Sequence, residues 1–199
     1  MNNKIENKQE KLKWYWGHEE LLAQVQTGDI FLEKTRFNIK KPKSWLSYLV
    51  RKIAGIIYNH ARAVIIEDNE RYVIEATTPK VKKTSWVDVI NDSEIEKVLI
   101  LRVKENIEIN QQKYIQEAKD LIGLPYDKPA LLFHQLVMQM TKRIKLDIWI
   151  GRTKKKSMGM WYCYEIVAYL WRQYYPKFWR VDPEEFMNLS IWNIYFKSE

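Results

Sequence analysis

The 199-residue sequence contains a single cysteine, Cys163, and only three histidines. One cysteine excludes an internal disulfide framework and leaves a free thiol, which is compatible with a reducing compartment. One cysteine and three scattered histidines also lack the spacing of metal ligands. We therefore expect neither a metal site nor a cofactor.

Long apolar runs are also missing. Residues 1–13 are polar and charged, without the hydrophobic stretch of a secretory signal. The apolar runs at 45–58 and 130–140 are interrupted or too short to span a bilayer. We expect a cytoplasmic protein. Peripheral association with an anionic membrane stays open, because residues 44–58 form a basic amphipathic pattern.

Positive charge is in excess over negative charge. The chain has 33 Lys and Arg against 25 Asp and Glu, which gives a formal net charge of +8. This surplus favours an anionic neighbour, such as nucleic acid, a membrane surface or an acidic substrate. No recognisable nucleic-acid-binding module accompanies the basic residues, so we expect no specific nucleic-acid partner.

The patterning predicts one α+β domain over residues 19–199, after a flexible segment at 1–18. Its clearest local feature is a β-hairpin in which strands at 61–67 and 71–77 are joined by Asp68-Asn69. Further strands are expected at 29–33 and 97–104, and helices at 19–26, 44–58, 111–122, 130–140 and 162–175. Residues 128–159 are expected to form an insertion or lid. The C-terminal piece is otherwise irregular but contains a short helix that Asp182 caps and Pro183 begins.

Cys163 stands where the helix at 162–175 is expected to begin. The unpaired N–H groups and the positive end of the macrodipole at a helix start favour thiolate over thiol, and thiolate is the form that attacks carbonyl groups. A nucleophilic cysteine also needs a base. His60 is the histidine at a structured position, at the start of the first hairpin strand.

The hairpin brings His60 close to an acidic residue. With Asp68-Asn69 as its loop, Arg62 faces Glu75 directly, and His60 lies diagonal to Glu75 on the same face of the sheet. Glu75 can therefore hold the far nitrogen of the imidazole, as in nucleophilic hydrolases. Residue types alone leave an alternative open, in which Glu75 and Arg62 form an ordinary ion pair and the histidine is solvated.

Five segments follow one another in the order found in one protein family. They are Gly28-Asp29-Ile30-Phe31-Leu32, His60-Ala61, Val73-Ile74-Glu75-Ala76, Leu124-Pro125-Tyr126-Asp127 and Cys163-Tyr164-Glu165-Ile166-Val167. In this order, over residues 28–190, the chain resembles the circularly permuted papain-like cysteine hydrolases, the YiiX/YebB-like group of the NlpC-like clan. The resemblance implies an antiparallel sheet or half-barrel packed against helices, with the nucleophile at the N-terminus of a helix.

The resemblance also implies roles for individual residues. Cys163 is the expected nucleophile, His60 the general base and later acid, and Glu75 the third catalytic residue, which orients the imidazole. Backbone N–H groups at the helix start, including that of Cys163, are expected to stabilise the oxyanion.

Three further residues are expected to contact substrate. Tyr126 is implied as a pocket residue by the resemblance. Tyr164 replaces the serine that commonly follows the cysteine in the family, and its bulk is expected to narrow the cleft. Arg62 lies on the face of His60, where it is expected either to bind an anionic substrate group or to neutralise Glu75.

The resemblance implies a cysteine hydrolase that cleaves an amide or peptide bond, such as one in a cell-wall peptide, through a thioester. Two alternatives remain at this point. One is a lipid-directed acyl hydrolase or acyltransferase that acts on acyl esters at the same site, which the basic amphipathic segment and the many Trp and Tyr favour. The other is a non-catalytic binding protein of the same fold.

Overall fold

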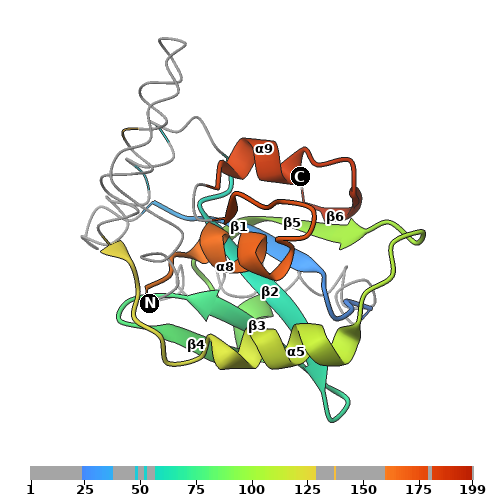
Figure 1. Ribbon diagram of the computed structural model, residues 1–199. Coiled ribbons are helices and arrows are strands. Elements are labelled where there is room, and N and C mark those ends of the chain that lie inside the picture. Colours follow the sequence, from blue (N-terminus) through green and yellow to red (C-terminus); the bar gives the residue numbers. More distant parts are fainter. Residues whose placement is uncertain are drawn as a thin grey trace.

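The computed structural model describes residues 24–37, 57–128, 160–178 and 181–198, together with Tyr48, Lys52 and Val137. These residues form a six-stranded antiparallel sheet with the order β4-β3-β2-β1-β5-β6 (Figure 1). The strands are β1 (Ile30–Thr35), β2 (His60–Glu67), β3 (Glu70–Ala76), β4 (Val81–Ser85), β5 (Ile95–Val103) and β6 (Trp192–Lys197). The helices are α4 (Trp86–Ile90), α5 (Gln111–Asp120), α8 (Cys163–Leu170) and α9 (Pro183–Met187). The predicted class, an antiparallel sheet packed against helices, is confirmed.

The hairpin of β2 and β3 forms as the sequence predicted. Asp68 and Asn69 take positive φ angles of 53° and 63°, the left-handed conformation that a tight two-residue turn requires. In the resulting register Ala63 pairs with Ile74. This register is the one from which Arg62 and Glu75 were predicted to face each other, and it places His60 at the open end of the hairpin.

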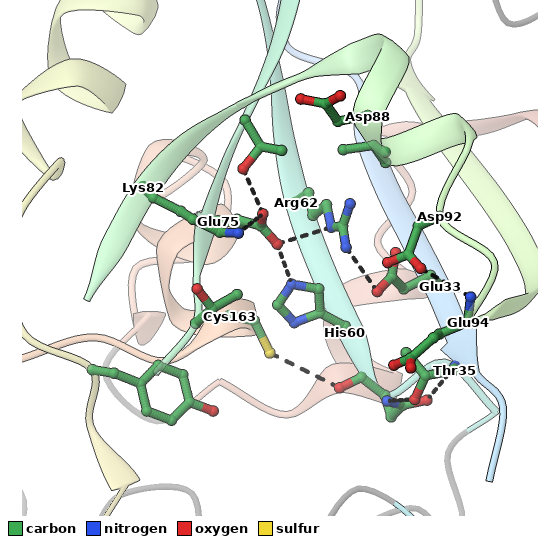
Figure 2. A pocket seen from close by; sticks show the side chains of 15 residues that line it. Glu33, Thr35, His60, Arg62, Glu75, Lys82, Asp88, Asp92, Glu94 and Cys163 are labelled. Atoms are coloured by element: carbon green, nitrogen blue, oxygen red, sulfur yellow. Dashed lines mark hydrogen bonds and ion pairs between the residues drawn. The ribbon is translucent and has the colours of Figure 1, made fainter. Parts of the chain in front are cut away.

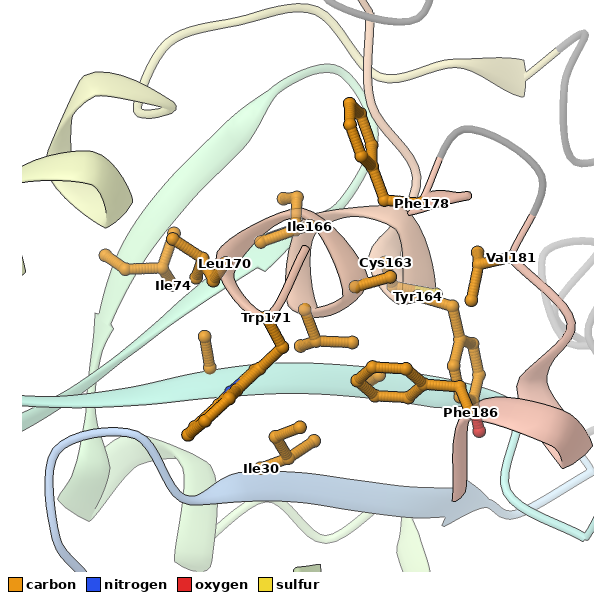
Figure 3. Close-up of a cluster of buried hydrophobic side chains, with 14 of the residues drawn as sticks. Ile30, Ile74, Cys163, Tyr164, Ile166, Leu170, Trp171, Phe178, Val181 and Phe186 are labelled. Carbon is orange, nitrogen blue, oxygen red and sulfur yellow. The ribbon is translucent and has the colours of Figure 1, made fainter. Parts of the chain in front are cut away.

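Helices cover both faces of the sheet. Because alternate residues of a strand point to opposite faces, Ala61 and Ala63 of β2 pack under α8 and α5, whereas Val64 packs on the other face with Trp86 of α4. Figure 3 shows Ile166 and neighbouring side chains of α8 above the strands. The apolar residues of β5 are likewise shared between the two faces. The packing of α8 on β2 brings the first residues of both elements together.

Two helices begin at capping side chains, among them Asp182, which the sequence predicted. The Asn110 side chain accepts a hydrogen bond from the N–H of Lys113 at 3.0 Å and starts α5. Asp182 accepts from the N–H of Glu184 at 2.9 Å, with Pro183 in the first turn of α9. These caps fix the ends of two elements that pack against the core.

Several elements differ from the predictions. Residues 24–26 form a turn and irregular backbone instead of the end of a helix, and α8 ends at Leu170 and continues as turns. The strands β4 and β6 and the helix α4 were not predicted. Segments 1–18, 130–136 and 138–140, and most of 44–58 and of the expected lid at 128–159, lie outside the described residues. Within the described residues, no helix is long and apolar enough to cross a bilayer.

Gly28 occupies a position that only glycine fits. Its φ is +98°, and a Cβ there would lie 2.7 Å from Ile109 Cδ1 and 3.3 Å from Trp171 Cζ2. We expect Gly28→Ala to lower the free energy of unfolding by about 2–4 kcal/mol, through backbone strain and overpacking together. Gly123→Ala is the matched control, because Gly123 also has a positive φ of +88° but open space around it. Urea unfolding of both variants checks this, and equal losses would contradict the contribution of the clash.

Candidate active site

The start of α8 is fastened to the residues that precede β2. Tyr162, in an extended conformation, precedes the first helical residue, Cys163. The hydroxyl of Tyr164 donates to the carbonyl of Tyr58 at 2.8 Å, and the Cys163 sulfur lies 4.0 Å from the carbonyl oxygen of Asn59. Since His60 follows directly, these contacts set the cysteine beside the histidine (Figure 2).

His60 has different partners on its two sides. Its Nε2 lies 2.9 Å from Glu75 Oε2, so Nδ1 is left for the side of Cys163, whose sulfur lies beside the imidazole (Figure 2). Burial by itself lowers the pKa of His60. The charge and hydrogen bond of Cys163, with the carboxylates of Glu75 and Glu33, outweigh burial and raise this pKa from 6.5 to about 10. The imidazolium form is therefore favoured at neutral pH.

Glu75 is buried and held from several directions. One oxygen, Oε1, accepts from Thr84 Oγ1 at 2.7 Å and lies 3.3 Å from Lys82 Nζ. The other, Oε2, faces both His60 and, at 3.1 Å, Nε of Arg62. Burial alone raises the pKa of Glu75, but the hydrogen bonds and charges of His60, Arg62 and Thr84 lower it well below 4.5. Glu75 is thus ionised at neutral pH and fixed in position.

Arg62 connects two buried carboxylates. Besides Glu75, it contacts Glu33 of β1, with Nη2 to Oε1 at 3.0 Å. Of the two roles that the sequence left open for Arg62, the structure shows the pairing with Glu75. Sequence reasoning missed Glu33. The only signal was that an acidic residue, Glu33, directly follows the apolar run Ile30–Leu32. The partner of Glu33 depends on the β1–β2 register, in which Glu33 faces His60.

These side chains lie on one wall of a pocket of about 530 Å³. It is lined by Glu33, Thr35, Asn59, His60, Arg62, Glu75, Thr77, Lys82, Thr84, Asp88, Val89, Asp92, Glu94, Tyr126 and Cys163. Tyr126 lines the pocket, as expected. Tyr164 does not: it is buried in the core below α8, and its hydroxyl is used by Tyr58. The structure therefore gives Tyr164 a role in placing α8 and does not bring it to the cleft.

The order of these parts along the chain is a further observation. The histidine and its carboxylate partner come from a hairpin near residue 70, and the cysteine helix follows about a hundred residues later. A family model of permuted papain-like amidase enzymes, YaeF/YiiX, C92 family, matches residues 24–178. The chain belongs to this family. The resemblance seen in the sequence is confirmed, and at the level of its family the chain is a papain-like amidase of the cysteine-hydrolase type.

A solved structure supports the same fold for this amidase. The crystal structure of the metalloprotein yiiX from Escherichia coli O157:H7 superimposes with a TM-score of 0.52 at 25% identity, over 75% of this chain and 66% of that chain. The amidase thus spans about two thirds of the length of that structure. A comparison of this chain with curated protein sequences found no match. Over the described ranges of this amidase, no group of three or more His, Cys, Asp or Glu side chains is placed to hold a metal ion.

Proposed function

We propose that this amidase hydrolyses an amide bond of a peptide or related amide, with Cys163 as nucleophile. The observation that carries the proposal is the arrangement of three side chains at one pocket. Cys163 starts a helix, His60 lies beside its sulfur, and Glu75 holds the far nitrogen of the imidazole at 2.9 Å. This is the order of nucleophile, base and orienting group that acyl transfer through a covalent intermediate requires.

The first half of the reaction forms a thioester. The thiol proton resides on His60, and the sulfur of Cys163 attacks the carbonyl carbon of the amide. The negative charge that develops on the carbonyl oxygen is stabilised by the backbone N–H of Cys163 at the helix start. As the C–N bond breaks, the imidazolium gives its proton to the leaving nitrogen, which departs as an amine.

The second half releases the acid. The imidazole of His60, now neutral, takes a proton from a water molecule, and the resulting hydroxide attacks the thioester carbon. The C–S bond breaks, the sulfur leaves as thiolate and the carboxylic acid is released. The proton taken from water stays on the imidazole, which restores the thiolate–imidazolium pair of Cys163 and His60. Glu75 takes no proton in this cycle, because its role is to keep the ring oriented and to stabilise its positive charge.

The pocket favours an amide substrate over a long acyl chain. Most of its described lining is charged or polar, with Val89 as the only aliphatic side chain among the residues named above. A lipid-directed enzyme needs an apolar channel for the acyl chain, since each buried methylene group contributes about 0.8 kcal/mol. We therefore place the lipid-directed reading behind the amidase reading.

A comparison of wild type with Cys163→Ala tests the proposal. Both proteins are incubated with a panel of peptides, simple amides, acyl esters and phospholipids, and the products are identified by mass spectrometry. We expect wild type alone to release an acid and an amine from an amide, and brief quenching to trap an acyl group on Cys163. Identical product profiles for the two proteins would support the binding-protein alternative, and products from phospholipids alone would support the lipid-directed one.

A further inference from the structure

The pocket carries a charge opposite to that of the whole chain. The protein has a net charge of +8, yet among the residues that the structure describes the pocket is lined by five carboxylates and two permanent cations, Arg62 and Lys82. Both cations are already engaged, since Lys82 lies 3.3 Å from Glu75 and Arg62 bridges Glu75 and Glu33. An anionic substrate group would therefore meet cations that the protein itself occupies, together with excess negative charge.

One buried carboxylate oxygen in this pocket has no partner within the described part of the chain. Glu33 is 2% exposed, and while its Oε1 accepts from Arg62, its Oε2 makes no hydrogen bond to any described residue. A buried acceptor without a donor is costly, because it has lost its hydrogen bonds to water and gained none in return. Burial raises the pKa of Glu33. The charges of Arg62 and His60 oppose this effect, and the charges of Glu75 and Asp92 add to it. A cation bound at this position would give Oε2 of Glu33 a hydrogen-bond donor and would stabilise the charged form of this carboxylate.

Further acidic side chains line the same pocket. Asp88 lies in α4, Asp92 follows the C-cap Asn91 of that helix, and both line the pocket together with Glu94. One oxygen of Asp92 accepts the N–H of Glu94 at 2.9 Å. Figure 2 shows the Asp92 carboxylate next to that of Glu33. Such a cluster presents several acceptors to one donor-rich group, and an ammonium group has three N–H donors and no acceptor.

We call the part of the pocket lined by Glu33, Asp88, Asp92 and Glu94 its acidic end. The position of this acidic end relative to the reacting atoms indicates which half of a substrate it meets. In Figure 2, His60 lies between the sulfur of Cys163 and the carboxylates of Glu33 and Asp92. In the proposed reaction, His60 protonates the leaving nitrogen, so the leaving amine lies on the His60 side of the sulfur. The acidic end is then beyond the leaving nitrogen and away from the acyl group.

We propose that this acidic end, formed by Glu33, Asp88, Asp92 and Glu94, binds a primary ammonium group in the amine half of the amide substrate. The inference rests on the proposed amidase function and specifies its substrate class: amides whose leaving amine carries a second, positively charged amino group. Hydrolysis of the amide then yields a carboxylic acid and a diamine. The ammonium donates to Oε2 of Glu33 and to Asp92, and the wider cluster attracts it by charge.

A matched pair of small amides tests this substrate class. N-(4-aminobutyl)acetamide carries the ammonium group, and N-butylacetamide is its neutral counterpart. Binding of each to Cys163→Ala is measured by ligand-observed NMR titration, and hydrolysis of each by wild type is measured by product analysis. We expect the charged amide to bind about tenfold more tightly, the scale of one hydrogen bond to a charged group. Failure of hydrolysis with retained binding preference would overturn the proposed reaction and leave this subsite supported.

Variants of the acidic end locate the effect. Asp92→Asn keeps an oxygen for the Glu94 N–H but removes the charge, and we expect it to reduce the preference for the charged amide about three- to tenfold. Asp88 is exposed, so Asp88→Asn should reduce the preference for the charged amide only about twofold. Glu105 is an exposed carboxylate outside the pocket lining, so Glu105→Gln is the control and should keep the full preference. Equal binding of the two amides, no saturable binding of either, or an unchanged preference in Asp92→Asn would each overturn the proposal.

Discussion

Replacing His60 by alanine is expected to reduce kcat for the amide by about 10⁵- to 10⁶-fold, the scale seen when one member of a nucleophile–base unit is removed. His60 accepts the thiol proton and later returns it to the leaving nitrogen, so both halves of the reaction depend on it. Added imidazole should restore part of the activity, because the substitution leaves space between Cys163 and Glu75. Steady-state kinetics with and without imidazole checks this, and His60→Ala with near wild-type activity would remove the proposed mechanism.

The protonation of His60 gives this prediction a second readout. Because its pKa is raised from 6.5 to about 10, the imidazolium is retained well above neutral pH. The stability that this charge contributes is present in full below pH 6.5 and is lost as the pH rises through about 10. We expect iodoacetamide to alkylate Cys163 faster than free cysteine at pH 6, and His60→Ala to lose this advantage. A variant that merely misfolds would instead show a lowered unfolding midpoint by circular dichroism.

The parts of the site that sequence reasoning predicted depend on local patterns. Asp68-Asn69 is a turn sequence that fixes the hairpin register, and the register alone places His60 near Glu75. The helix start at Cys163 follows from an apolar run that begins there. No non-local information was needed for these three side chains, apart from the meeting of the helix with the hairpin, which the order of family segments indicated.

The parts that were missed depend on pairings between distant segments. The role of Glu33 requires the register of β1 against β2, two strands separated by 24 residues, and no turn between them reveals it. The direction of Tyr164 depends on how α8 is rotated on the sheet. The strand β4, Val81–Ser85, is a polar edge strand, and an edge strand with one partner needs little apolar alternation to form. Its role in the site, to supply Thr84 and Lys82 to Glu75, followed only from the structure.

The ion network gives the site more than an oriented imidazole. Arg62 is shared between Glu33 and Glu75, so the carboxylate that orients His60 is itself held by a buried cation. Glu75 stabilises the imidazolium on one side of this guanidinium, and Glu33 faces the proposed ammonium subsite on the other. The same network therefore connects the protonation of the base with the choice of substrate.

Replacing Glu75 by glutamine is the second change with a large expected effect. We expect kcat to fall about 10²- to 10⁴-fold, as expected when the residue that orients a catalytic histidine loses its charge. The glutamine keeps the size of the side chain and an oxygen for Thr84, but it no longer offsets the charges of His60 and Arg62. Kinetics of the amide reaction measures the loss.

Two further measurements separate positioning by Glu75 from a merely structural contribution. The pKa of Glu75 is lowered from 4.5, so its stabilising effect is present above pH 4.5 and is lost as the pH falls below it. Glu75→Gln should therefore flatten the acid limb of the plot of stability against pH. The step in the alkylation rate of Cys163 by iodoacetamide that accompanies loss of the imidazolium proton should also move to lower pH, because His60 loses a stabilising charge. Glu67→Gln is the matched control, since Glu67 lies on the same hairpin outside the pocket and pairs with Lys83 and Lys119. If Glu75→Gln loses stability like a structural variant but keeps the wild-type alkylation profile, Glu75 supports the fold and does not tune the imidazole.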